Sequence, residues 1–164
     1  MLTTVILGSN SGNKAEYIKQ ATRLLTQQCG QLTVSSSLYE TAPWGFECNE
    51  PFLNQVLQFE TELQPEMFLQ QSLAIEKSLG RIRSSEIRYA SRTIDIDLLF
   101  CDDEIIHTPT LTLPHPRIAE RRFVLVPLHE IIPDFVHPLL HKTITQLLSE
   151  CNDSLPVKII TTTI

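Results

Sequence analysis

One stretch, from Arg88 to Leu99, constrains the chain more than any other segment. Near its end, apolar residues alternate with Asp95 and Asp97, which is the two-residue period of a β-strand. Both carboxylates therefore project from the same face of that strand, roughly 6.5–7 Å apart. Because like charges this close repel each other, a folded protein needs a partner for them, and Mg²⁺ prefers oxygen ligands of this kind. The pattern predicts a strand that carries a metal site.

The same segment is rich in arginine. A carboxylate pair beside a group of permanent positive charges is typical of a site for a metal-bound polyphosphate. The residues alone leave an alternative open, in which the aspartates lie on a solvated strand face and the arginines only solvate a loop. The arginine residues of the window 81–92 are Arg81, Arg83, Arg88 and Arg92.

The distribution of charge favours a small anionic ligand. The net charge of −6 argues against general nucleic-acid binding, which would favour a basic surface. Even so, seven of the 13 lysine and arginine residues lie in just two windows, 81–92 and 117–122. Guanidinium groups present fork-shaped donors that match phosphate oxygens, so local clusters of this kind indicate a phosphate-bearing ligand.

Length and composition indicate one domain, 1–164, that is large enough to bury a core. No apolar run approaches the length of a membrane span, so we expect no membrane association. The four cysteines show no Cys-x-x-Cys spacing, and no secretory segment precedes the first expected strand. We therefore expect reduced thiols and a cytoplasmic protein.

Periodicity predicts the order strand, helix, strand, strand, helix, strand, followed by smaller elements. Asn13 is expected to cap the first helix and Gly30 to close it, while Pro65 begins the second helix and Gly80 ends it. This order predicts an α+β protein, a ferredoxin-like two-layer α/β sandwich with an antiparallel sheet. Strands or extended segments are expected at 3–7, 32–39, 52–61, 94–98, 104–107 and 111–113, short helices at 117–122, 124–131 and 143–150, and a β-prone tail of unpredicted position at 157–164.

Asn54 is a polar residue among apolar neighbours in the expected strand 52–61. If it is buried, its amide needs hydrogen-bond partners. The period alone leaves two roles open for it, ligand binding and a structural bond to the loop that contains Trp44.

Several further motifs accompany the central stretch: Leu7-Gly-Ser-Asn10, Tyr39-Glu-Thr-Ala-Pro43, Phe52-Leu-Asn54, Leu113-Pro-His-Pro-Arg117 and Arg121-Arg-Phe-Val-Leu125. With them the sequence, from about residue 7 to 133, resembles the 6-hydroxymethyl-7,8-dihydropterin pyrophosphokinases of folate biosynthesis. The resemblance implies a ferredoxin-like fold and the transfer of the terminal pyrophosphoryl group of ATP to the pterin hydroxymethyl group, with release of AMP. It implies ATP and the pterin as small-molecule partners, and we expect a monomer.

The resemblance also implies roles for individual residues. Asp95 and Asp97 would hold two Mg²⁺ ions that bridge the ATP phosphates, and Arg81 and Arg92 would clamp those phosphates, so that Arg81, Arg92 and Asp97 form the catalytic set. The remaining ATP-binding positions would be Glu76, Arg83, Arg88, Tyr89, Leu98, Thr112, His115 and Arg121. Phe52 and Phe123 would sandwich the flat pterin, and Thr41, Pro43, Trp44 and Asn54 would line its hydrogen-bonding edge.

Two alternatives come from other classes of protein: a metal-dependent phosphatase or glycosyltransferase built on Asp-x-Asp, and a non-catalytic nucleotide-binding module. A metal-dependent phosphatase of the haloacid-dehalogenase type would place the pair near its first strand with Thr or Val two residues later, where this chain has Leu99. An Asp-x-Asp glycosyltransferase normally needs a longer chain. A non-catalytic nucleotide-binding relative would bind ATP without releasing AMP.

Overall fold

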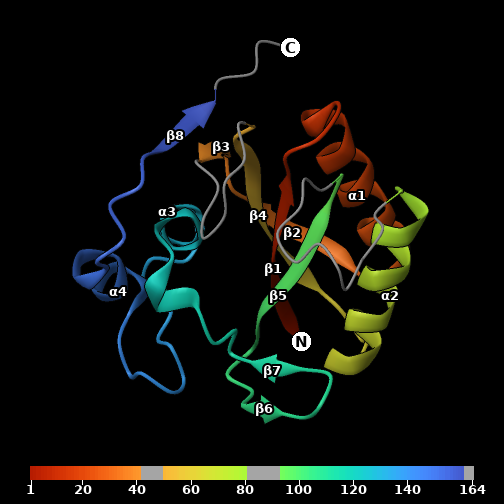
Figure 1. The fold of residues 1–164 in the computed structure, drawn as a ribbon. Coiled ribbons are helices and arrows are strands. Elements are labelled where there is room, and N and C mark those ends of the chain that lie inside the picture. Colours follow the sequence, from red (N-terminus) through yellow and green to blue (C-terminus); the bar gives the residue numbers. More distant parts are fainter. Residues whose placement is uncertain (42–49, 81–92, 161–164) are drawn as a thin grey trace.

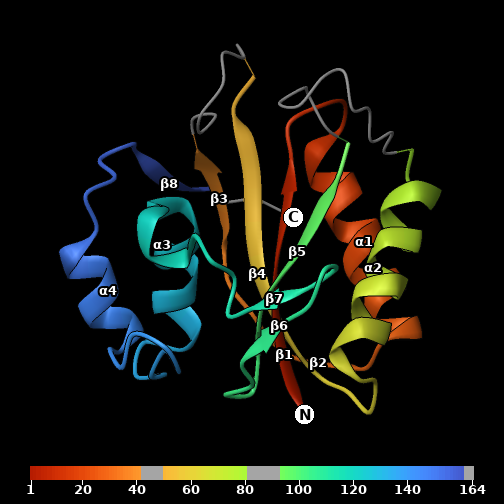
Figure 2. The ribbon, with the colours of Figure 1, turned by 60° about the horizontal axis from the view of Figure 1, so that its bottom comes forward.

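The computed structural model describes residues 1–41, 50–80 and 93–160, which form a central sheet with helices packed on both faces (Figure 1). Figure 2 shows helices α1 and α2 on one side of the sheet and α3 and α4 on the other. The elements are β1 (Leu2–Ser9), α1 (Lys14–Gln28), β2 (Gln31–Ser35), β3 (Leu38–Thr41), β4 (Phe52–Glu60), α2 (Pro65–Ser78), β5 (Asp95–Cys101), β6 (Ile106–His107), β7 (Thr112–Leu113), the 3₁₀ turn η1 (Ile118–Glu120), α3 (Arg122–Ile131), α4 (Ile144–Glu150) and β8 (Val157–Ile160).

The sheet has the order β5-β1-β4-β3-β8, and β2 also pairs with β4. Strand β1 is antiparallel to both β4 and β5, and β4 is antiparallel to β2 and β3. Helix α1 therefore connects two strands that flank β4, and α2 connects two strands that flank β1. This is the ferredoxin-like arrangement that the sequence predicts.

Alternation along the strands sends apolar side chains into a separate core on each face of the sheet. Val5 and Leu7 of β1 belong to the core under α1 and α2, whereas Ile6 between them belongs to the core under α3 and α4. Phe68 and Leu125 are fully buried on opposite faces. The short helices after β5 thus add a partial third layer to the expected two-layer sandwich.

The segment 32–39, expected to be one extended piece, forms two strands. The backbone breaks after β2 at Ser36, whose N–H donates to the Val56 carbonyl while its Oγ accepts from the Val56 N–H. Ser36 thus takes both backbone hydrogen bonds of one β4 residue, and β3 then continues along the same strand. Residue alternation carries no signal for such a break.

Helix α1 ends where expected, but the role of Gly30 differs from the expectation. The backbone of Gly30 is not among the positive-φ glycines, which are Gly12 and Gly80 in the described chain. A Cβ at Gly30 would lie only 2.3 Å from the Glu60 carbonyl oxygen. Glycine is therefore needed because the start of β2 approaches the end of β4 closely.

The tail of the chain adds a strand to the sheet edge. Residues 157–160 form β8, which pairs antiparallel with β3. Helix α4 before it begins with a capping box, in which Thr143 and Gln146 bond each other's backbone N–H groups. Within residues 1–41, 50–80 and 93–160, no helix is both long and apolar enough to cross a membrane.

Candidate functional site

The carboxylate pair lies on β5 as predicted. Ile96, between the two aspartates, packs into the core under α1 and α2, so Asp95 and Asp97 face the opposite side. Asp95 is buried, with 8% of its surface exposed, and Asp97 is half-buried. Among the described residues no group of three or more His, Cys, Asp or Glu side chains could form a protein-only metal site. Two oxygen-donor groups at a partly open position suit Mg²⁺, which usually takes one or two carboxylates together with substrate phosphates.

Gly8 opens the sheet surface beside Asp95. It is the cross-strand neighbour of Asp95 on one side and of Asn54 on the other. A Cβ at Gly8 would lie 2.9 Å from Asn54 Oδ1 and 3.6 Å from the Phe52 ring. The missing side chain therefore lets Asn54 and Phe52 lie over β1, on the same face as Asp95.

Asn54 is buried, and its amide has a defined partner. Its Nδ2 donates to Thr41 Oγ1 at 2.7 Å, across the β3–β4 pair. The sequence left ligand binding and a structural bond open for Asn54. The structure shows a structural bond, and its partner is Thr41, another predicted pterin-binding residue.

Glu76 holds the strand that carries the aspartates. This α2 residue is 2% exposed, and its Oε2 accepts a hydrogen bond from the Ile96 N–H at 3.0 Å. Ile96 lies between Asp95 and Asp97 on the edge strand β5. A buried carboxylate therefore fixes the backbone of the carboxylate pair from the side opposite to β1.

Three other predicted nucleotide residues, Leu98 of β5, Thr112 and His115, lie in different environments. Leu98 is buried in the core under α1 and α2, and Thr112 of β7 is half-buried. The His115 N–H donates to the Leu99 carbonyl, and His115 Nδ1 accepts from the Arg117 N–H at 3.2 Å. Burial, with the positive charges of Arg121 and Arg117, lowers the pKa of His115 to about 4. The imidazole is therefore neutral near pH 7.

We expect His115 to destabilise the fold in acid. Its folded pKa of about 4 lies below the ordinary 6.5, so the unfolded chain binds this proton first as the pH falls. The free energy of unfolding should therefore decrease between about pH 6.5 and 4, by at most about 3 kcal/mol from this group. Urea unfolding at pH 7 and 4.5 should show a smaller decrease for His115→Gln than for the parent chain.

The matched control is His107→Gln, at an exposed position on β6. It should keep the acid dependence of the parent chain. An equal loss of stability on acidification in the parent chain and in His115→Gln would show that His115 is not the group responsible.

Arg121 and Phe123 meet at the start of α3. The Arg121 guanidinium carbon lies 5.7 Å from the centre of the Phe123 ring, within the range of a cation–π contact. Phe123 packs at the border of the core under α3 and α4, which is the face of the sheet that also carries Asn54 and Phe52. The start of α3 thus brings a cation and an aromatic ring to the face of the carboxylate pair.

A clamp between α3 and β3, which sequence reasoning missed, fixes this helix. The Glu130 carboxylate accepts hydrogen bonds from Tyr39 Oη at 2.6 Å and from the Ser37 N–H at 2.9 and 3.0 Å. Burial alone would raise the pKa of Glu130, but the bonds from Tyr39 and Ser37 outweigh it and lower that pKa. Burial and the Glu130 carboxylate raise the pKa of Tyr39. The motif Tyr39-Glu-Thr-Ala-Pro43 marks Tyr39 in the sequence. No local pattern, however, links Tyr39 to Glu130, which lies 91 positions later.

Seven of the predicted site residues lie outside the described residues. The structure therefore gives no geometry for the arginine-rich segment or for the loop that contains the only tryptophan. These seven residues are Pro43, Trp44, Arg81, Arg83, Arg88, Tyr89 and Arg92.

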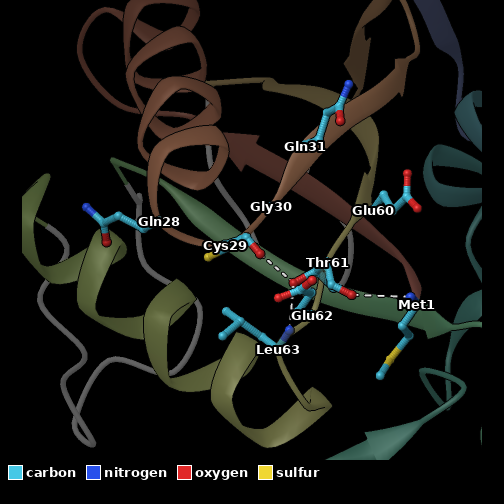
Figure 3. A pocket seen from close by; sticks show the side chains of 9 residues that line it. All are labelled: Met1, Gln28, Cys29, Gly30, Gln31, Glu60, Thr61, Glu62 and Leu63. Carbon is cyan, nitrogen blue, oxygen red and sulfur yellow. Dashed lines mark hydrogen bonds between the residues drawn. The ribbon is translucent and has the colours of Figure 1, made fainter.

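A cavity of about 450 Å³ lies where β1 begins and β4 ends, at the end of the sheet away from Gly8 (Figure 3). Its lining includes Glu60 and Glu62 but no lysine or arginine, the wrong charge for a phosphate ligand. Burial raises the pKa of Cys29 there to about 11, so its thiol stays protonated and unreactive near neutral pH. This cavity is therefore separate from the candidate site, which lies at the Gly8 end of β1.

Comparisons with known proteins show which proteins this chain is similar to. A family model described as 7,8-dihydro-6-hydroxymethylpterin-pyrophosphokinase matches residues 4–133. A 2-amino-4-hydroxy-6-hydroxymethyldihydropteridine pyrophosphokinase of Bacillus subtilis is 44% identical over 128 residues, which cover 77% of this chain and 75% of that relative. A protein of the same name from Aquifex aeolicus is 38% identical over 144 residues, 88% of each chain.

A solved structure of Plasmodium falciparum HPPK-DHPS, wild type with pteroate, has the same fold. It superposes with a TM-score of 0.74 over 91% of this chain, at 18% sequence identity. The chain spans 42% of the length of that solved protein. At this identity the likeness shows the fold alone.

Proposed function

We propose that this chain, which belongs to the 7,8-dihydro-6-hydroxymethylpterin-pyrophosphokinase family, transfers a pyrophosphoryl group from ATP to the hydroxymethyl group of 6-hydroxymethyl-7,8-dihydropterin and releases AMP. It is thereby an enzyme of folate biosynthesis, of a family that uses ATP, generally with Mg²⁺. The observation that carries the proposal is the family match over residues 4–133, which includes the carboxylate pair of β5.

On the metal side, Asp95 and Asp97 would hold two Mg²⁺ ions together with the phosphates of ATP. The ions, when bound, would polarise the attacked phosphorus and neutralise charge on the leaving group. The protein's part is to fix the two carboxylates. Pairing of Asp95 with Gly8 and the Glu76 bond to Ile96 support this role, because they hold the strand from both sides.

On the nucleotide side, Arg81 and Arg92 would clamp the phosphates, and Asp97 completes the catalytic set. Because Nδ1 accepts from the Arg117 N–H, the neutral imidazole of His115 carries its proton on Nε2 and can donate a hydrogen bond from there to the nucleotide. Arg121 would supply positive charge beside it. The other nucleotide contacts in this proposal are Glu76, Arg83, Arg88, Tyr89, Leu98 and Thr112.

On the pterin side, Phe52 and Phe123 would stack on the two faces of the ring. Stacking supplies contact area and planarity, and polar groups supply selectivity. Support comes from Gly8, whose missing side chain leaves room above β1, and from the Asn54–Thr41 bond, which fixes the orientation of the Asn54 amide. Pro43 and Trp44 would complete the hydrogen-bonding edge.

Replacement of Phe123 tests the pterin side. Phe123→Ala should weaken pterin binding by about 1–3 kcal/mol, the range found when an aromatic platform under a nucleobase is removed. ATP affinity should hardly change, because the ring is proposed to contact only the pterin. Calorimetric titration of the variant with each ligand measures both effects, and equal losses for pterin and ATP would make Phe123 a core residue instead.

We further propose that residues 1–164 act as a single-domain monomer in the cytoplasm, without nucleic-acid partners. The net charge of −6 supports the absence of nucleic-acid binding. Cys29, Cys101 and Cys151 are free thiols, which is usual in a reducing compartment.

A further inference from the structure

The chain after α4 forms a strap, residues 151–160, that runs from α4 past α3 to the sheet edge (Figure 2). Its last part is β8, which pairs with β3. The family model ends at residue 133, so the strap lies outside the part of the chain that the family model matches. It nevertheless touches two elements that carry proposed pterin-binding residues.

The first contact is at the start of α3. Asp153 Oδ2 accepts a hydrogen bond from the Arg122 N–H at 3.1 Å, and Asp153 Oδ1 accepts from the Leu155 N–H at 3.0 Å. Arg122 is the first residue of α3, and the preceding Arg121 makes no side-chain cap. Asp153 therefore supplies from the strap the acceptor and the negative charge that a helix N-terminus normally receives from its own cap residue.

The second contact is along β3. Val157 is the cross-strand partner of Thr41, and Ile159 is the partner of Tyr39. Thr41 Oγ1 also accepts the hydrogen bond from Asn54. Strand β3 has only four residues, so β8 on one side and β4 on the other together fix the position of Thr41.

We propose that the strap positions the pterin side of the site, with Asp153 as a positioning residue that acts through the first turn of α3. The inference rests on the proposed function. Phe123 directly follows the residue that Asp153 holds, so its ring depends on how that first turn is fixed. The backbone of Arg121 is held separately, by its N–H bond to the Ile118 carbonyl of η1. The strap should therefore affect the pterin more than the nucleotide.

The test compares Asp153→Ala with Asp153→Asn in the full chain, by AMP release at varied pterin and varied ATP. Asp153→Ala should raise the pterin KM about fivefold, which is the change in an equilibrium constant that corresponds to the free energy of one helix cap. The ATP KM should stay at the parent value. Asp153→Asn keeps an acceptor for the Arg122 N–H and should restore most of the pterin KM, because Asn caps helices about as well as Asp.

The matched control is Glu150→Ala, an acidic residue of α4 that bonds Lys142 and makes no hydrogen bond to α3 among those described. It should leave both KM values unchanged. A lower melting temperature of Asp153→Ala with both KM values unchanged would reduce the strap to a structural element and overturn the proposal. Equal rises in the pterin and ATP KM would overturn it too.

Failure of the proposed function has a different signature, since the parent chain itself would then release no AMP with the pterin. The strap is still tested in that case by calorimetric titration of the parent chain and Asp153→Ala with 6-hydroxymethyl-7,8-dihydropterin. About fivefold weaker binding to Asp153→Ala supports the positioning role, and equal or absent binding overturns it.

Discussion

Asp97→Ala should lower pyrophosphoryl transfer at least about a thousandfold at saturating Mg²⁺, because a catalytic metal contributes several kcal/mol of charge stabilisation. Asp95→Ala should have an effect of similar size. Both variants should stay folded, since loss of one carboxylate relieves repulsion within the pair. Steady-state AMP release measures the rate, and circular dichroism with thermal melting checks the fold.

Asp103→Ala is the matched control for the carboxylate pair. Asp103 is exposed in the turn directly after β5, two positions from the last residue of that strand. Its replacement should leave the rate unchanged. Transfer at close to the parent rate in Asp95→Ala or Asp97→Ala would exclude the two-metal proposal for these residues.

Arg92→Ala should lower the rate of the chemical step roughly 10²–10³-fold, the range for loss of one transition-state donor. Arg92 lies outside the described residues, but only Thr93 separates it from Ile94, which is fully buried before β5. A donor attached next to a fixed strand is suited to stabilise charge that is redistributed in the transition state. Single-turnover kinetics at saturating ATP, Mg²⁺ and pterin isolates this step.

Arg92→Lys separates geometry from charge at the same position. It should recover only part of the rate, because an ammonium group cannot make the bidentate contact of a guanidinium group. If Arg92→Ala keeps the single-turnover rate and loses only ATP affinity, Arg92 acts as a ground-state clamp, and its assignment to the chemical step is wrong.

Local patterns in the sequence predicted the parts of the fold that depend on local physics. Alternation identified the strand of Asp95 and Asp97, and helical spacing with end signals identified α1 and α2. The Asn13 side chain does cap α1, by accepting from the Glu16 N–H. The ferredoxin-like order followed from these elements, because connection lengths leave few ways to join them.

Local patterns cannot predict contacts between residues that are far apart in the sequence. The break at Ser36 depends on its pairing with Val56, and the edge position of β8 depends on its register with β3. Gly30 was expected to act as a helix terminator, whereas its neighbour in space, Glu60, decides its role. In each case the cause lies at least 20 residues away in the sequence.

The candidate site, too, has residues that the sequence predicts and contacts that it does not. Resemblance to a family named Asp95, Asn54 and Phe123, and the described chain brings all three to one face of the sheet. The resemblance does not explain why position 8 is a glycine. The cross-strand register explains it, because a Cβ at Gly8 would meet Asn54 and Phe52. The backbone role of Glu76 was also hidden, because a carboxylate on a helix carries no sign of the strand that it will bond.

The most direct test of the account is AMP formation by the purified chain from ATP and Mg²⁺, measured with and without 6-hydroxymethyl-7,8-dihydropterin. We predict AMP release only when the pterin is present, in amounts equal to the pyrophosphorylated pterin formed. Release of inorganic phosphate without the pterin would instead indicate a metal-dependent phosphatase. ATP binding with no AMP release in the presence of the pterin would contradict the proposed function and indicate a non-catalytic nucleotide-binding relative.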